Sequence, residues 1–227
     1  MTEQNGEFYR DLGQDKYLTE VKRFVPGYDQ MTKVVANLVI ESIPSHVLDI
    51  GSGVGNVDSV ILSSLGNVRM TCLESAEPMV RATETFLRKY ESRVHIVNDR
   101  VQDFRFNETY DCAFSNLVLH NIPHNEKGDV LVEIRNSLED GAPFIWGDLI
   151  RYNSLKQKLL VGYRHALAFQ KGSSFNLVLK DWRKERHDDT KLSLEETISL
   201  CKRVGFQKPR LVWKKTRGTT GVFYMRK

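Results

Sequence analysis

The feature that most constrains this chain is a glycine-rich segment that runs His-Val-Leu-Asp-Ile-Gly-Ser-Gly-Val-Gly-Asn from His46 to Asn56. Its apolar first half predicts a short buried strand, and the residues that follow it predict a helix. Glycines at positions 51, 53 and 55 allow the backbone to turn sharply and leave space for a ligand beside it. A strand, a glycine loop and a helix in this order predict an α/β protein that holds a nucleotide-like cofactor.

The rest of the chain provides enough apolar material for one folded domain. Its 227 residues are 41% hydrophobic and 27% charged, as in ordinary globular proteins. No apolar run approaches the about 18 residues of a membrane helix, and the polar N-terminus does not resemble a secretory signal. Cys72, Cys112 and Cys201 lie far apart and form no metal-ligand pattern. We therefore expect a cytoplasmic protein with buried thiols, no bound metal and no membrane contact.

The net charge of +4 hides a strong asymmetry between the two parts of the chain. Residues 1–150 contain 14 Lys and Arg against 23 Asp and Glu, a net charge of −9. Residues 151–227 contain 19 against 6, a net charge of +13. This split indicates either an anionic partner at the C-terminal part or basic residues that only solvate helix faces there.

Strand and helix patterns alternate through the middle of the chain. The predicted strands are Val47–Ile50, Val68–Leu73, Val94–Val97, Tyr110–Ser115 and Ala142–Trp146. The predicted helices between them are Val57–Leu65, Pro78–Tyr90 and Glu126–Leu138. Strands separated by helices indicate βαβ units and a parallel sheet.

The C-terminal end departs from this alternation. Leu192–Val204 is predicted as a helix with Ser193 and Glu196 as its capping box. The strands Arg210–Lys214 and Gly221–Met225 then follow with too few residues between them for a parallel crossover, so they must form a hairpin. The predicted fold is a seven-stranded, mostly parallel, doubly wound α/β sheet that ends in a C-terminal antiparallel hairpin.

We expect a single domain, residues 1–227, with four parts. Residues 1–44 form an N-terminal helical cap with an amphipathic helix at Asp29–Glu41, and residues 45–150 form the cofactor-binding core. Residues 151–190 are aromatic and basic, and we predict that this insertion is a helical lid over the carboxyl edge of the sheet. Residues 191–227 contain the last helix and the hairpin.

Three features select among nucleotide-like cofactors. A dinucleotide loop needs a third glycine where this chain has Asn56. Asp49 stands two residues before the first glycine, and Glu74 ends the second predicted strand, where it can accept hydrogen bonds from both ribose hydroxyls. The C-terminal hairpin has no place in the usual dinucleotide sheet. The glycine loop therefore does not indicate NAD or FAD.

These segments together resemble the class I S-adenosylmethionine-dependent methyltransferases. Val47–Gly55 is similar to their first motif, Leu73–Met79 to the second, Asn98-Asp99 to the third and Asp111–Asn116 to the fourth. The resemblance covers about residues 45–150 and the final hairpin. It implies the Rossmann-like methyltransferase fold and S-adenosyl-L-methionine as the cofactor.

The resemblance also implies roles for individual residues. The backbone at Gly51–Gly53 would approach the methionine part of the cofactor, and Asp49 would lie near its α-amino group. Glu74 would take the ribose diol. Asp99 would accept a hydrogen bond from the adenine amino group, with Arg100 beside it.

Met79 would pack on the adenine or, equally, in the core. Asn116 would present its backbone or amide near the methionine and the transferred group, and we include it among the catalytic candidates. The implied cofactor site contains Tyr28, Asp49, Gly51, Ser52, Gly53, Glu74, Ser75, Met79, Asp99, Arg100 and Asn116.

A second, partial resemblance is to the carboxy-S-adenosylmethionine synthases, which serve tRNA wobble-uridine modification. The stretch Val25-Pro-Gly-Tyr28 before the first strand is similar to theirs, and it implies that Tyr28 closes over the cofactor. That family also binds a cofactor carboxylate with a late arginine, for which Arg183 and Arg186 are the candidates here. The glycine loop differs, because that family has a Gly-Cys-Ser-Leu-Gly type of loop.

His120 follows the fourth strand at the mouth of the expected pocket, where it would be a general base, a substrate contact or a solvated loop residue. His124 stands four residues later, but Pro123 breaks a helix that would bring the two together on a metal. The first hypothesis is methyl transfer to a small, anionic acceptor. The alternatives are carboxy-S-adenosylmethionine formation and an RNA-binding module on the same scaffold. The sequence leaves the oligomeric state open, and a homodimer is one of the alternatives.

Overall fold

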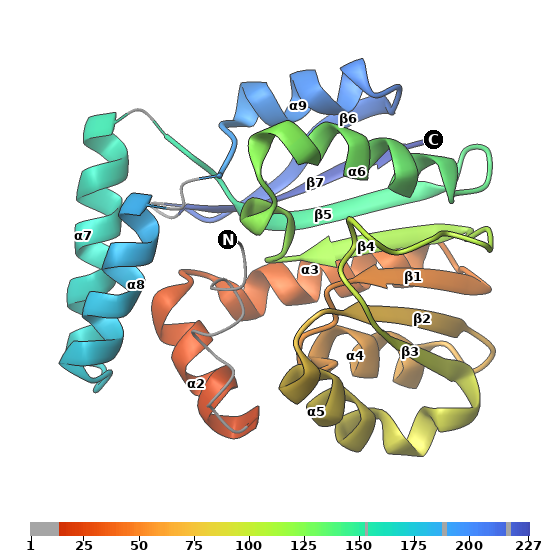
Figure 1. Ribbon diagram of the computed structural model, residues 1–227, viewed down its shortest axis with the longest axis horizontal. Helices are drawn as coiled ribbons and strands as arrows, with labels where there is room; N and C mark the ends of the chain where they lie inside the picture. The colour runs from red at the N-terminus through yellow and green to blue at the C-terminus, as the bar shows by residue number, and fades with distance from the viewer. Residues whose placement is uncertain (1–13, 153, 188–189, 217–218) are drawn as a thin grey trace.

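The computed structural model describes residues 14–152, 154–187, 190–216 and 219–227 (Figure 1). Its strands are β1 (His46–Ile50), β2 (Arg69–Glu74), β3 (Val94–Asn98), β4 (Cys112–Asn116), β5 (Pro143–Leu149), β6 (Gln207–Lys214) and β7 (Thr220–Arg226). Its α-helices are α2 (Gln14–Phe24), α3 (Tyr28–Glu41), α4 (Asn56–Ser64), α5 (Glu77–Leu87), α6 (His124–Asn136), α7 (Ser154–Gln170), α8 (Phe175–His187) and α9 (Leu194–Arg203). Two 3₁₀ helices, η1 (Arg88–Arg93) and η2 (Leu119–Asn121), complete the described elements.

The seven strands form one sheet in the order β3-β2-β1-β4-β5-β7-β6. The first five strands are parallel, whereas β7 runs antiparallel to both β5 and β6. This confirms the predicted mostly parallel sheet with a C-terminal hairpin. The chain direction of the crossovers reverses between β1 and β4, and ligands of open α/β sheets bind at the carboxyl ends of the strands at such a point.

Helices cover both faces of the sheet (Figure 1). Helices α3 and α4 pack on one face in a core cluster that includes Met31, Val35 and Ile61, all fully buried. Helices α6 and α9 pack on the other face, where Leu131 and Ile134 are fully buried. The two apolar layers explain why the central strands are apolar along their whole length rather than alternating.

Three helices lie apart from this sandwich, beyond the end at which β4 and β5 finish (Figure 1). The insertion predicted as helical forms α7 and α8, and α7 packs against α2. Helix α2 was not predicted from the sequence, although Val21 and Phe24 on it are buried. None of the helices in the described part of the chain is long and apolar enough to cross a membrane.

Several boundaries differ from the sequence predictions. Strand β5 continues to Leu149, three residues beyond the predicted end, because it pairs with β7 along its whole length. Helix α6 begins at His124 instead of Glu126, directly after Pro123. The capping box of α9 is confirmed: the Ser193 hydroxyl accepts the Glu196 N–H at 3.2 Å, and the Glu196 carboxylate accepts the Ser193 N–H at 2.7 Å.

Candidate functional site

The glycine loop, residues 51–55, connects β1 to α4 at the switch point of the sheet. Its three glycines have φ values of 81°, 59° and 76°, in the left-handed region that glycine adopts without strain. A Cβ added at Gly51 would overlap the Val118 side chain, so this glycine is needed for close packing as well as for backbone shape. The backbone N–H groups of Gly51 and Ser52 both donate to the Leu73 carbonyl, at 2.7 and 3.1 Å, which ties the loop to β2.

Glu74 lies directly beneath this loop at the end of β2. Its Oε2 accepts the Gly53 N–H at 2.9 Å, and its Oε1 accepts the Ala76 N–H at 2.8 Å. Burial raises the pKa of Glu74, although these backbone hydrogen bonds act in the opposite direction. The carboxylate is therefore held in one orientation at the position where the resemblance requires a diol acceptor.

Helix α2 lies over the outer side of the glycine loop. Among the described residues beyond its chain neighbours, the only heavy atom within 4 Å of a Cβ built at Gly53 is the Tyr17 hydroxyl oxygen, at 3.9 Å. Tyr17 also packs with Leu18 on a small apolar cluster that contains Val54 and Met79. Sequence reasoning missed Tyr17; the amphipathic spacing of residues 17, 18, 21 and 24 was the available signal. Met79 is buried in this cluster, so it lies beside the loop as both of its predicted roles require.

Asp49 is placed below the loop in a buried acidic pair with Asp58 of α4. Only 2% of Asp49 is exposed, and Asp49 pairs in register with Cys72 of β2. Burial and the neighbouring carboxylate of Asp58 raise the pKa of Asp49, and burial raises that of Asp58. The Cys72 thiol donates to Asp58 Oδ1 at 3.4 Å. Burial therefore favours the protonated form of these two carboxyls, and the predicted contact of Asp49 with the cofactor ammonium stays a prediction.

Asn116, at the end of β4, joins a polar network that reaches the glycine loop. Its amide nitrogen donates to Thr32 Oγ1 at 3.5 Å, whereas its Oδ1 is buried and accepts no hydrogen bond from the described residues. Tyr28 hydrogen-bonds to both Thr32 and Asn56, and burial raises the pKa of Tyr28 to about 12. Asn56, which excluded a dinucleotide loop, thus connects α4 to α3.

The remaining predicted residues lie at the ends of β2 and β3 or in the loop. Ser75 and Arg100 are exposed and Asp99 is half-buried. Asp99 accepts the Arg100 backbone N–H at 2.8 Å. The Ser52 hydroxyl is buried and has no hydrogen-bond partner among the described residues. Of the two late arginines, Arg183 is exposed on α8, and the side chain of Arg186 lies outside the described residues.

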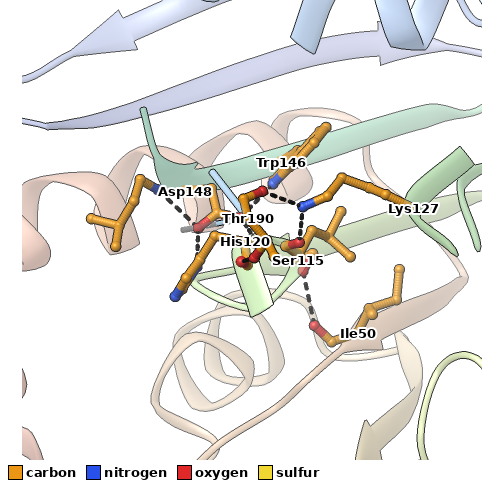
Figure 2. Close-up of polar contacts among 9 residues, drawn as sticks. Ile50, Ser115, His120, Lys127, Trp146, Asp148 and Thr190 are labelled. Atoms are coloured by element: carbon orange, nitrogen blue, oxygen red, sulfur yellow. Dashed lines mark hydrogen bonds and ion pairs between the residues drawn. The ribbon is translucent and has the colours of Figure 1, made fainter. Parts of the chain in front are cut away.

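His120 lies on η2, next to the end of β5 (Figure 2). Its Nδ1 is 2.5 Å from Asp148 Oδ1, and its backbone N–H donates to Asp148 Oδ2 at 2.9 Å. Asp148 also accepts the Trp146 Nε1–H and the Leu149 N–H, each at 2.8 Å. Burial alone would raise the pKa of Asp148, but the charge of His120 and these hydrogen bonds hold it below its usual value. Because Nδ1 contacts Asp148, Nε2 lies on the opposite side of the imidazole ring.

A buried lysine fixes the position of η2 (Figure 2). The Lys127 ammonium donates to the carbonyl oxygens of Leu119, at 2.6 Å, and Thr190, at 2.8 Å. The Thr190 hydroxyl donates in turn to the His120 carbonyl. Leu117, between β4 and η2, has a φ of 64°, a strained value that is concentrated at functional sites. Sequence reasoning missed both Asp148 and Lys127, because their partners are far away in the sequence.

Comparisons with known proteins show similarity to methyltransferases. Residues 47–141 match the family model described as a methyltransferase domain. A curated relative, ribosomal RNA small subunit methyltransferase G of Thermotoga neapolitana, is 28% identical over 192 residues, which are 83% of this chain and 71% of the relative.

The solved structures with this fold are also methyltransferases. A putative O-methyltransferase from Nostoc punctiforme has a TM-score of 0.66 at 19% identity, over 88% of this chain and 56% of that one. Human N-acetylserotonin methyltransferase with bound S-adenosylmethionine has a TM-score of 0.66 at 14% identity, over 97% of this chain and 57% of that one. The N-methyltransferase NodS of Bradyrhizobium japonicum with S-adenosylhomocysteine has a TM-score of 0.69 at 12% identity, over 99% of this chain and 97% of that one. The chain thus spans just over half the length of the first two.

Proposed function

We propose that this chain, which carries a class I S-adenosylmethionine-dependent methyltransferase domain, transfers a methyl group to a small anionic acceptor. The observation that carries the proposal is the position of Glu74. Its carboxylate accepts hydrogen bonds from two backbone N–H groups and is held beside the glycine loop. S-adenosyl-L-methionine is the cofactor of this domain. It has a ribose diol and an ammonium group but no phosphate, and it therefore needs carboxylates rather than a phosphate-binding nest.

The polar groups around the loop fit this cofactor. Three of them, Ser52 Oγ, Asn116 Oδ1 and Asp49 Oδ1, are buried without a hydrogen-bond donor from the described residues. Buried polar atoms in proteins are normally hydrogen-bonded, so acceptors that lack donors favour a ligand that supplies N–H or O–H groups. We assign Glu74 to the diol, and Asn116 and Asp49 to the amino-acid end of the cofactor.

His120 is the general base of the proposed reaction. S-adenosylmethionine supplies a methyl group on a sulfonium, so the protein needs mainly to position the acceptor in line with it. An acceptor with a hydroxyl or protonated amine must lose a proton, which His120 Nε2 can take while Asp148 stabilises the ring through Nδ1. Asp148 is a positioning residue, because it acts through His120.

The acceptor is assigned as anionic from the charge of the C-terminal part. Residues 204–227 contain seven Lys and Arg and no Asp or Glu, and residues 151–227 as a whole carry a net charge of +13. The α7–α8 segment, which lies beyond the carboxyl edge of the sheet, belongs to this basic part. A carboxylate or phosphate on the acceptor would be attracted there.

RNA is the second candidate acceptor, because the curated relative is named a ribosomal RNA methyltransferase and the hairpin is basic. For an RNA acceptor, the logarithm of the binding constant should fall linearly with the logarithm of the salt concentration. Carboxy-S-adenosylmethionine synthesis is a third candidate, supported by Tyr28 at the loop but not by Arg183, which is exposed.

Four measurements test these assignments. In titration calorimetry, S-adenosylhomocysteine should bind the native protein, and an absence of binding would refute the proposal. Mass spectrometry of the cofactor retained through purification separates methyl transfer from the carboxylated alternative by the mass of one carboxylate group. Transfer of labelled methyl to small hydroxy acids, but not to RNA, is the result expected for the first candidate. For His120→Ala we expect lost transfer with unchanged S-adenosylhomocysteine affinity.

A further inference from the structure

Large apolar side chains are exposed mainly on one part of the molecule. Ten large hydrophobic residues are at least 36% exposed in the described part of the chain, and six of them lie on α7 and α8. They are Leu155 (69%), Leu159 (67%), Tyr163 (59%), Phe169 (58%), Phe175 (66%) and Trp182 (40%). Such a concentration indicates a surface that is covered by another molecule in solution.

Five of the exposed residues of α7 follow a heptad spacing. Leu155, Leu159, Gly162, Ala166 and Phe169 are all exposed, and the intervals between them are 4, 3, 4 and 3 residues. On the opposite side of the helix, Val161, Arg164 and Ala168 are buried against α2 and α8. This spacing is that of the seam between two packed helices. Helix α7 therefore presents one face to its own chain and a second, unfilled face to a partner helix.

Small residues in the middle of this seam favour a protein partner over a lipid surface. A Cβ built at Gly162 meets no heavy atom of the described part of the chain within 4 Å, so the helix surface at this point is open. Glycine and alanine four residues apart allow two helix backbones to approach closely. A helix that lies on a membrane would instead need large apolar residues at these positions.

We propose that a second copy of this chain fills the seam, with the two α7 helices antiparallel about a two-fold axis between residues 160 and 161. In this register Leu155 of each copy packs on Ala166 of the other, and Leu159 packs on Gly162. Each of these two layers then pairs one large with one small residue. A two-fold dimer requires a surface that is complementary to itself, and the sequence of α7 has this property.

The charges on α7 agree with the antiparallel orientation. The helix contains no Asp or Glu, and Lys156 and Lys158 lie near its N-terminus, where positive charge opposes the helix dipole. In the antiparallel pair Lys156 and Lys158 lie opposite positions 165 and 163 of the second copy's α7, so the lysines of the two copies are kept apart. A parallel pair would place the four lysines together.

The proposed dimer would also support the site. The buried face of α7 connects to α8 by the Arg164–Asp181 ion pair at 2.7 Å, and Ser173 donates to Glu20 of α2 at 2.6 Å. Helix α2 in turn places Tyr17 over the glycine loop. The partner would therefore hold α7, α8 and α2 as one unit, whatever acceptor the site takes.

Sedimentation of the purified chain at micromolar concentration tests the assembly. The expected mass is twice 26.2 kDa, and Leu159→Glu should reduce it to 26.2 kDa. Gly162→Leu should do the same while the chain stays folded, because its side chain meets open space and leucine favours a helix more than glycine does. The control is Phe86→Glu, which places the same charge at an exposed apolar residue of α5 and should leave the dimer intact.

Cysteine cross-linking tests the orientation, since Cys72, Cys112 and Cys201 are all buried. A mixture of Leu155→Cys and Ala166→Cys chains should form a disulfide dimer, whereas each variant alone should not. These positions are about 16 Å apart along one helix, far beyond disulfide reach, so the bond cannot form within a chain or between parallel helices.

Four results would overturn the proposal. A wild-type chain that sediments as a monomer, or a Gly162→Leu variant that stays dimeric, would exclude the α7 seam as the interface. Cross-linking of Leu155→Cys with itself would exclude the antiparallel register. Flotation of a monomeric wild-type chain with anionic vesicles would assign the exposed face to a lipid surface instead.

Discussion

Replacement of Asp148 by asparagine tests the buried contact on which the proposed base depends. Each carboxylate oxygen of Asp148 accepts two N–H groups: Oδ1 those of His120 Nδ1 and Leu149 N, and Oδ2 those of Trp146 Nε1 and His120 N. In Asp148→Asn one of the oxygens becomes an NH₂ group, which cannot accept either of its two donors.

The expected cost follows from this count. Two buried N–H donors lose their acceptor, and each unsatisfied group costs about 1–3 kcal/mol, so the free energy of unfolding should fall by about 2–6 kcal/mol. Urea unfolding should show this as a lower midpoint with an unchanged slope. The control is Asp140→Asn, since the Asp140 side chain is fully exposed and should leave the midpoint unchanged. A loss below about 1 kcal/mol for Asp148→Asn would refute the four-contact geometry.

The pH dependence of the same variant gives an independent check. The pKa of Asp148 is lower in the folded protein than in the unfolded chain, so its contribution is present above about pH 4 and is lost as the pH falls through the folded value. The difference in stability between the wild type and Asp148→Asn should therefore shrink as the pH falls below about 4. A difference that grows on acidification would contradict the assigned charge.

Three further results are expected. Glu74→Ala should weaken S-adenosylhomocysteine binding by about 1.5–3 kcal/mol in calorimetry, because a charged acceptor is lost, whereas the exposed Glu77→Ala should not. Gly51→Ala should destabilise the fold by about 1–3 kcal/mol in urea unfolding, because its φ is 81° and the methyl group would overlap Val118. Burial raises the pKa of Asp58, so the free energy of unfolding should fall as the pH rises from about 4 to the pKa of Asp58 in the folded protein. Asp58→Asn should reduce this fall, and equal pH slopes for the wild type and the variant would contradict the assignment.

The local patterns of the sequence were sufficient for much of the fold. The glycine loop, the parallel strands and the hairpin depend on backbone constraints and apolar periods within about 15 residues, and these can be read along the chain. The short link between the last two strands allowed one connection only. Glu74 could be predicted in the same way, because it ends the strand that lies next to the glycine loop.

What the sequence alone determined is thus the order of the elements, the direction of the strands and the class of cofactor. The tertiary structure alone decided that Tyr17 lies over the loop, that Asn56 meets Tyr28, and that Asp148 pairs with His120, 28 residues earlier. The physical reason is that these contacts depend on the direction of side chains on elements brought together by packing. A periodic pattern marks which face of an element is buried but not which other element that face contacts, whereas backbone constraints act between neighbours and are visible in the sequence.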